Sequence, residues 1–181
     1  YTDEDKIDMR GRKHFEPAFK PDYNIDFLRH GNYICHMLVA RANLAKSVGF
    51  RPLYDGAQDY DFIFRCAEGA RAIHHIPRVL YHWRCHPNST AGNSESKTYA
   101  YTAGVNALQA HMNRCGIKGA AFQIPDFWGY YGFRYDLVEA YNISVITTAD
   151  LSDDVFLHVS RAYEDALCAG SLIERVNATA F

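Results

Sequence analysis

GAQDYDFIFRCAEGARAIHHIPRVLYHWR, residues 56–84, changes its hydrophobic pattern half-way along and thereby decides the class of fold. Its first half predicts a helix that begins near Gln58. Phe62, Cys66 and Ala70 recur at a spacing of four residues, which places them on one helical face. Its second half is rich in β-branched and aromatic residues and predicts extended segments. A helix followed directly by strand indicates an α/β fold.

Further helices and a strand are expected on both sides of this stretch. Proline near a helix start, an Asn cap and glycine stops supply the boundaries. The expected elements are a short helix at 21–28 that Gly31 ends, a strand at 32–40 (NYICHMLVA), a short helix between Asn43 and Gly49, and the longest helical pattern, at about 97–115.

The chain is expected to divide into three parts. Residues 1–118 form the main unit, 119–141 a connector rich in aromatic residues and glycine, and 142–181 the start of another β-α unit. In the last part, NISVITT (142–148) predicts a buried strand. A helix pattern follows it, with Ser152 or Asp153 at the cap.

Charge and composition argue against several classes of partner. The formal net charge is −2, and no basic stripe of clustered Lys and Arg is evident of the kind that binds nucleic acid or an anionic membrane surface. No apolar run approaches the roughly 20 residues of a membrane-spanning helix. The five cysteines are widely spaced and contain no C-x-x-C pair, so reduced thiols and a cytoplasmic location are expected.

Three acidic residues, Asp3, Glu4 and Asp5, stand in YTDEDKID at residues 1–8. An isolated acidic cluster at a chain end is usually solvated charge. Here it is followed, in order, by six further stretches, and together they resemble the carboxyl half of the catalytic domain of a family 2 glycosyltransferase of the polysaccharide-synthesis type. The resemblance covers about residues 1–118. The stretches are FKPDYNIDFL, NYICHMLVARANL, VGFRP, GAQDYDFIFR, HIPRVLYHWR and HPNSTA.

The resemblance implies a truncated GT-A-like mixed sheet with flanking helices. It places the three acids where the family carries a D-x-D-like motif at the end of a central strand. Asp3 and Asp5 are then expected to bind the diphosphate of a nucleotide-sugar donor, a UDP-sugar, together with Mn²⁺ or Mg²⁺. Carboxylates suit such ions, and the metal stabilises the leaving diphosphate.

Asp59 in GAQDYD matches the family position whose carboxylate is the general base of inverting transfer. Such a base removes the proton of the acceptor hydroxyl as that hydroxyl attacks the anomeric carbon. The sequence departs from the family's E-D pair, because Gln58 stands where Glu is usual. Asp61 is better explained as an acid that stabilises the helix start.

The stretch YHWRCHPNST resembles the family's late strand and loop, which approach the diphosphate. Strand alternation places His82, Arg84 and His86 on one face. Arg84 and His86 are expected to bind the donor, and His86 also the metal; His82 is a weaker candidate, and His74 and His75 have no such support. Expected acceptor contacts come from a polar segment and an aromatic ring: Asn32, Tyr33, His36 and Trp83.

Family members carry a uridine-binding half that would precede Tyr1, so this piece is expected to have little or no transferase activity alone. Residues 142–181 resemble the start of a second GT-A unit, or complete the first sheet. Sheet edges left by truncation predict homo-oligomers. The partner beside the donor is a glycan or glycosylated acceptor. The chief alternative is a non-catalytic carbohydrate-binding or assembly module; a metal-dependent phosphohydrolase ranks last.

Overall fold

The structure is a computed structural model that describes residues 1–85, 98–136, 142–148 and 172–178. The chain divides into two compact units, Tyr1–Arg134 and Tyr135–Phe181. No helix in these ranges combines the length and the apolar character that crossing a bilayer requires.

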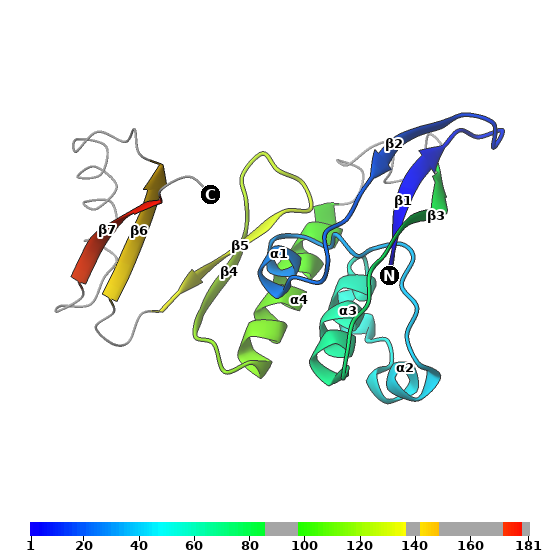
Figure 1. The fold of residues 1–181 in the computed structure, drawn as a ribbon. Coiled ribbons are helices and arrows are strands. Elements are labelled where there is room, and N and C mark those ends of the chain that lie inside the picture. The colour runs from blue at the N-terminus through cyan, green and yellow to red at the C-terminus, as the bar shows by residue number, and fades with distance from the viewer. Residues whose placement is uncertain (86–97, 137–141, 149–171, 179–181) are drawn as a thin grey trace. The chain divides into compact units, whose positions relative to one another are not determined.

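A three-stranded mixed sheet opens the first unit. Its central strand β1, Thr2–Ile7, pairs antiparallel with β2, His14–Ala18, and parallel with β3, Ile76–Arg84 (Figure 1). β3 is a single strand that contains Pro77, which an edge strand tolerates because one side of it makes no ladder bonds. The expected α/β class, a small mixed sheet with flanking helices, is confirmed.

The three acids of YTDEDKID lie inside β1, not at the end of a strand as the resemblance implied. The strand continues through Ile7 because β2 folds back along it and β3 pairs with it as far as Arg84. Successive side chains of a strand point to opposite faces, so Asp3 and Asp5 share one face and Glu4 takes the other.

Helices form much of the remainder of this unit and lie close to their predicted positions, although α1 begins at Ile25 and not near Pro21. α1 is capped by the Asn24 side chain, which accepts from the Phe27 N–H at 2.9 Å, and Gly31 ends it. α2 begins after Arg41, so Asn43 lies inside its first turn and is not the cap. The helices are α1 Ile25–His30, α2 Ala42–Val48, the 3₁₀ turn η1 Pro52–Tyr54, α3 Gln58–Gly69 and α4 Thr98–Arg114.

The hydrophobic core lies where α3 packs against α4. Tyr60 and Phe64 of α3 meet Leu108 and Met112 of α4, and all four side chains are buried. Four-residue spacing on each helix produces this shared face. On α4 it was predicted, whereas on α3 the predicted face was Phe62, Cys66 and Ala70, and Ala70 lies beyond the end of the helix.

One expected strand is wrong. Residues 32–40 do not form a strand, despite their β-branched and aromatic composition, but run as a loop from α1 to α2. Their carbonyls are bound from the side: the buried Lys20 ammonium donates to the carbonyls of Ile34, at 2.8 Å, and of His36, and the Thr2 N–H donates to Met37. Because these carbonyls already accept hydrogen bonds, pairing them with a neighbouring strand would add no further stabilisation from them.

The aromatic connector forms a two-stranded sheet of β4, Gly119–Gln123, and β5, Tyr131–Tyr135. Tyr131 lies across α4 at Gly104, where a Cβ would stand 1.9 Å from the Tyr131 hydroxyl oxygen, so only glycine fits. Gly31 forms an antiparallel bridge with Tyr130, which ties the connector to the end of α1.

The second unit contains β6, Asn142–Thr148, and β7, Leu172–Ala178, paired in parallel. The strand expected at 142–148 is therefore confirmed, whereas β7 was not predicted. The helix expected after it, with its cap at Ser152 or Asp153, lies outside the described residues.

Candidate functional site

Asp5, His14 and His82 come together on one face of the sheet, one from each strand; we call them the Asp5 cluster. Asp5 of β1 stands directly opposite His82 of β3 in the parallel register. His14 begins β2, and a register irregularity between Glu4 and Lys6 brings it back toward Asp5.

Both imidazoles bind the same carboxylate. His82 Nδ1 lies 2.5 Å from Asp5 Oδ1, and His14 Nδ1 lies 2.9 Å from Oδ2. The two rings meet edge to face at 4.5 Å between centroids. Burial raises the pKa of the Asp5 carboxyl, but the hydrogen bonds from His82 and His14 outweigh it and leave the pKa below its ordinary value.

Asp3 shares the face of Asp5 but is bound elsewhere. Its Oδ1 accepts from the Lys20 N–H at 3.0 Å and lies 2.8 Å from His75 Nε2, and its side chain is almost completely buried. His75, for which no sequence pattern suggested a role, therefore binds one of the motif's acids. Asp3 and Asp5 do not converge on one point.

A second group lies around Asp59 near the start of α3, and we call it the Asp59 cluster. Asp59 Oδ2 accepts from Asn32 Nδ2 at 2.9 Å and from the Cys35 thiol at 3.9 Å. Asn32 in turn accepts from the Cys35 N–H at 3.2 Å. The members of the cluster are Glu4, Lys20, Asn32, Cys35, His36 and Asp59.

The Asp59 cluster reaches the sheet through His36. His36 Nδ1 donates to Glu4 at 3.0 Å, and its Nε2 lies 3.6 Å from Cys35 Sγ. Its ring stacks on Tyr81 at 4.8 Å and meets Trp83 at 5.0 Å. Because Glu4 and Asp5 are neighbours in β1, the two clusters adjoin, but they are approached from opposite faces of that strand.

Burial governs the charges of the Asp59 cluster. Burial raises the pKa of the Cys35 thiol far above its ordinary value, and the nearby charges of Asp59 and Glu4 raise it further. Burial lowers the pKa of the Lys20 ammonium, while Glu4 at 3.7 Å opposes that shift. Cys35 is therefore a neutral thiol beside an acceptor-only carboxylate.

The other predicted site residues lie as follows. Tyr33 packs between Tyr1 and Phe27 and accepts from the Asn24 N–H, so no contact joins it to Asp59 among the described residues. Arg84 donates to the carbonyls of Asp8, at 3.3 Å, and Met9, at 2.9 Å, in the turn between β1 and β2. His86 lies outside the described residues.

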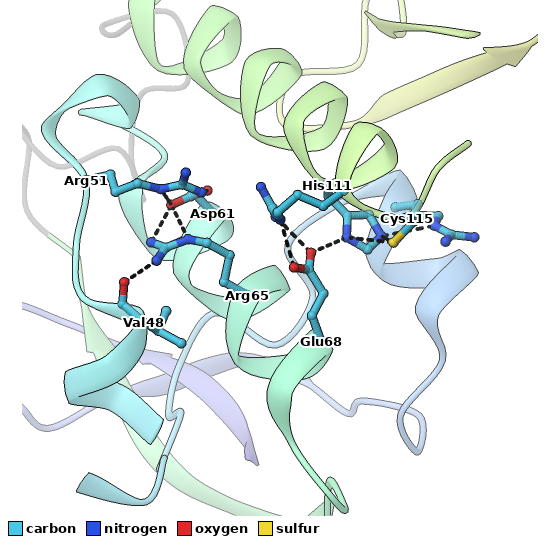
Figure 2. Close-up of polar contacts among 9 residues, drawn as sticks. Val48, Arg51, Asp61, Arg65, Glu68, His111 and Cys115 are labelled. Atoms are coloured by element: carbon cyan, nitrogen blue, oxygen red, sulfur yellow. Dashed lines mark hydrogen bonds and ion pairs between the residues drawn. The ribbon is translucent and has the colours of Figure 1, made fainter. Parts of the chain in front are cut away.

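Asp61 belongs to neither cluster. Its carboxylate is completely buried and accepts from Arg51 at 2.6 and 3.2 Å and from Arg65 at 2.6 and 2.9 Å (Figure 2). Arg65 also donates to the carbonyls of Val48 and Gly49 at the end of α2. Burial raises the pKa of Asp61, but the two guanidinium groups lower it below its ordinary value. Asp61 is therefore a structural tie, whereas the sequence explained it only as an acid that stabilises the helix start.

Two groups of side chains place three potential metal ligands within 4.8 Å of one another in the described part of the chain. The Asp5 cluster is the first. The second, Glu68, His111 and Cys115 (Figure 2), is already occupied by cations: Arg29 donates to His111 Nε2 at 3.3 Å, and Arg114 donates to Glu68 at 2.7 and 2.8 Å. Of the two, only the Asp5 cluster fits the divalent ion that the resemblance implies.

His14 was missed because residues 1–18 were not interpreted as a hairpin. The signal was present: RGRK, at residues 10–13, offers a glycine turn between two segments of alternating character. Gly11 has a φ of 69° there. A hairpin with that turn brings His14 alongside β1.

Comparison with known proteins finds similarity to two much longer chains. One is an uncharacterized protein, y4gI, of Sinorhizobium fredii, 49% identical over 138 residues, which are 75% of this chain and 15% of that one. The other is the O-antigen biosynthesis protein RfbC of Myxococcus xanthus, 41% identical over 117 residues, which are 64% of this chain and 9% of that one. No protein-family model matches the sequence, and no solved structure matches it.

Proposed function

We propose that the chain is part of a glycosyltransferase of polysaccharide synthesis that transfers a sugar from a nucleotide-diphosphate donor to a glycan acceptor with inversion. Similarity to an O-antigen biosynthesis protein supports the polysaccharide class. The seven stretches that resemble a family 2 glycosyltransferase support the reaction. The chain spans a small fraction of both relatives, so the donor, acceptor and partners named here are proposals.

The geometry of Asp59 carries the proposal. Its carboxylate is oriented by Asn32 through Oδ2, and no Lys, Arg or His of the described residues lies within ion-pair distance of it. A general base needs a fixed direction and an unoccupied lone pair. An arginine clamp like that on Asp61 would fix the direction but occupy the lone pairs. Asp59 would accept the proton of the acceptor hydroxyl as that oxygen bonds to the anomeric carbon and the diphosphate leaves.

The adjoining residues would bind the sugar, the metal ion and the diphosphate. Trp83 and His36 offer ring surfaces near Glu4 that suit a sugar face. The Asp5 cluster would hold a divalent ion, Mn²⁺ or Mg²⁺ in the expectation above, and such an ion would neutralise charge on the leaving diphosphate. Because this cluster lies on the face of β1 opposite Glu4, a donor bound to the ion would have to extend past the strand for its anomeric carbon to approach Asp59. Arg84 is a further donor ligand if its contacts to the Asp8 and Met9 carbonyls open.

The test is calorimetric titration of UDP and of uridine, with Mn²⁺ present, into the full chain and into its Asp59→Asn variant. We expect UDP to bind and uridine not to bind, because the diphosphate is the part of UDP that a divalent ion at the Asp5 cluster and Arg84 would contact. Asp59→Asn should bind UDP equally well, since Asp59 faces the acceptor. Binding of an oligosaccharide without any binding of UDP would contradict transfer and favour a carbohydrate-binding module.

We also propose self-association through the sheet. β2 and β3 are the outer strands of the described three-stranded sheet, and each leaves one row of backbone groups without a ladder partner in that sheet. Light scattering should show a mass above that of one chain at high concentration. A single-chain mass at every concentration would contradict the proposal.

A further inference from the structure

From the geometry of the Asp5 cluster we infer that Asp5, His14 and His82 bind a divalent transition-metal ion in preference to Mg²⁺, and that Asp3 is not a ligand. The ligand set differs from the one the sequence predicted, which was Asp3, Asp5 and His86. The role of this ion in sugar transfer rests on the proposed function, whereas its binding does not.

The three strands hold the donor atoms together without help from a flexible segment. Asp5 and His82 are register partners, and His14 lies across the hairpin. Each imidazole presents Nδ1 to one oxygen of the same carboxylate, at 2.5 and 2.9 Å. All three donors lie within 4.8 Å of one another, so small rotations about side-chain bonds would place an ion between them. A metal would replace two Nδ1 protons, and both imidazoles would bind as neutral ligands.

The surroundings favour a cation at this point. The described residues form no Lys or Arg ion pair with Asp5, whose charge is met by the two imidazoles alone. The group formed by Glu68, His111 and Cys115 has the same number of potential ligands, but Arg29 and Arg114 already donate to two of them. The group of Glu68, His111 and Cys115 is therefore an internal control. It has as many potential ligands as the Asp5 cluster, but the arginines bound to it should prevent metal binding.

Asp3 cannot join the site without losing its present partners. It is buried, and its Oδ1 holds both the Lys20 N–H and His75. Turning that carboxylate toward Asp5 would leave the Lys20 amide unpaired in a buried position, which is unfavourable because the amide would have no hydrogen-bond acceptor. Asp3 therefore fixes the hairpin beneath the site.

The chemistry of the donors decides which ion binds. Mg²⁺ requires six oxygen ligands in near-ideal octahedral geometry, whereas imidazole nitrogen suits transition ions such as Zn²⁺ and Co²⁺. Two nitrogens and one carboxylate therefore favour transition ions. The His14 and His82 side chains are 47% and 45% exposed, which leaves open positions for water or for oxygens of a diphosphate.

The test is titration of Co²⁺, Zn²⁺, Mn²⁺ and Mg²⁺, each alone, into the full chain, followed by calorimetry and, for Co²⁺, by the visible spectrum. We expect one site per chain, with Mg²⁺ at least ten-fold weaker than Co²⁺ and Zn²⁺. His14→Gln and His82→Gln should each weaken Co²⁺ binding at least ten-fold. His30→Gln is the matched control, an exposed histidine on α1, and Glu68→Gln tests the second group; neither should alter binding.

Three results would overturn the inference. Binding of Mg²⁺ as tight as that of Co²⁺ would contradict nitrogen ligation. Loss of the site in His86→Gln with normal binding in His14→Gln would restore the ligand set expected from the sequence. Loss in Glu68→Gln would move the ion to the second group. Circular dichroism of each variant shows whether it folds, and His14, half-exposed, is the position least able to disturb the fold. If the ion binds as inferred while UDP fails to bind, the proposed function fails and the metal site stands.

Discussion

Asp59 and Asp61 lie two residues apart in the first turn of α3, yet they differ in burial and in their binding partners. Asp61 is completely buried and clamped by two arginines, which lower its pKa. Asp59 is partly exposed, forms no ion pair with a described residue and is held by the neutral amide of Asn32. Helix geometry explains the difference, because residues two apart point in directions about 200° apart. The sequence shows two equivalent acids, whereas the fold makes one a structural tie and leaves the other without an ion pair among the described residues.

The largest effect should follow removal of the Asp61 charge. Asp61→Asn leaves Arg51 and Arg65 without a counter-charge, and we expect a loss of about 3–5 kcal/mol in the free energy of unfolding. Asp59→Asn removes the negative charge that accepts one hydrogen bond from the neutral Asn32 amide. The free energy of unfolding should fall by less than about 1 kcal/mol. Urea denaturation of both variants measures the difference, and equal losses would contradict the comparison.

The next effect concerns Lys20, the member of the Asp59 cluster that binds the carbonyls of the loop at residues 32–40. Lys20→Met keeps the apolar stem but leaves the Ile34 and His36 carbonyls without their donor and Glu4 without its cation. We expect a loss of about 2 kcal/mol in the free energy of unfolding. Lys46→Met, at an exposed position of α2, is the matched control and should change it by less than about 0.5 kcal/mol. Equal effects would mean that the Lys20 contacts do not stabilise the loop.

A smaller effect should appear with pH at His111. Burial lowers the pKa of His111 below its ordinary value of about 6.5, although Glu68 opposes the shift. A lowered histidine pKa means that the unfolded chain binds more protons, so this stability is present above about pH 6.5 and declines as pH falls through the folded pKa. Thermal unfolding at pH 7 and pH 5.5 should show a smaller decrease for His111→Gln than for the wild type. An identical decrease in both proteins would contradict this assignment.

The smallest effect is on the reactivity of Cys35. The Asp59 charge contributes to its raised pKa, so Asp59→Asn should speed alkylation of Cys35 several-fold. Cys66 is the control, because its pKa is raised by burial without any acidic neighbour. Mass spectrometry separates the two rates. An unchanged rate at Cys35 would mean that Asp59 carries no charge beside it.

Periodicity in the sequence predicted the helices well and the strands less well. α3 and α4 were predicted nearly to their ends because their buried faces repeat every three or four residues. The segment 32–40 has strand-like composition, but its backbone acceptors are bound by Lys20 and Thr2, and no local pattern reveals a partner so far away in sequence. The position of the acids inside β1 was missed, because the resemblance placed them at the end of a strand and three consecutive acids are typical of solvated charge.

The same limit applies to the site. Asp59 and Asn32, 27 residues apart, were both chosen from the sequence, and the structure joins them. Asp3 and Asp5 were treated as one motif, whereas their partners, His75 for one and His14 and His82 for the other, depend on strand register. Register over such distances is set by the packed fold, and spacing alone did not supply it.

The measurement that tests the account most directly is the anomalous scattering of Mn²⁺ in crystals of the chain grown with MnCl₂ and UDP. We predict one Mn²⁺ peak between Asp5, His14 and His82, with diphosphate oxygens on the ion and Asp59 free of any cation. An ion bound at Asp3, or a diphosphate bound away from both clusters, would contradict the account.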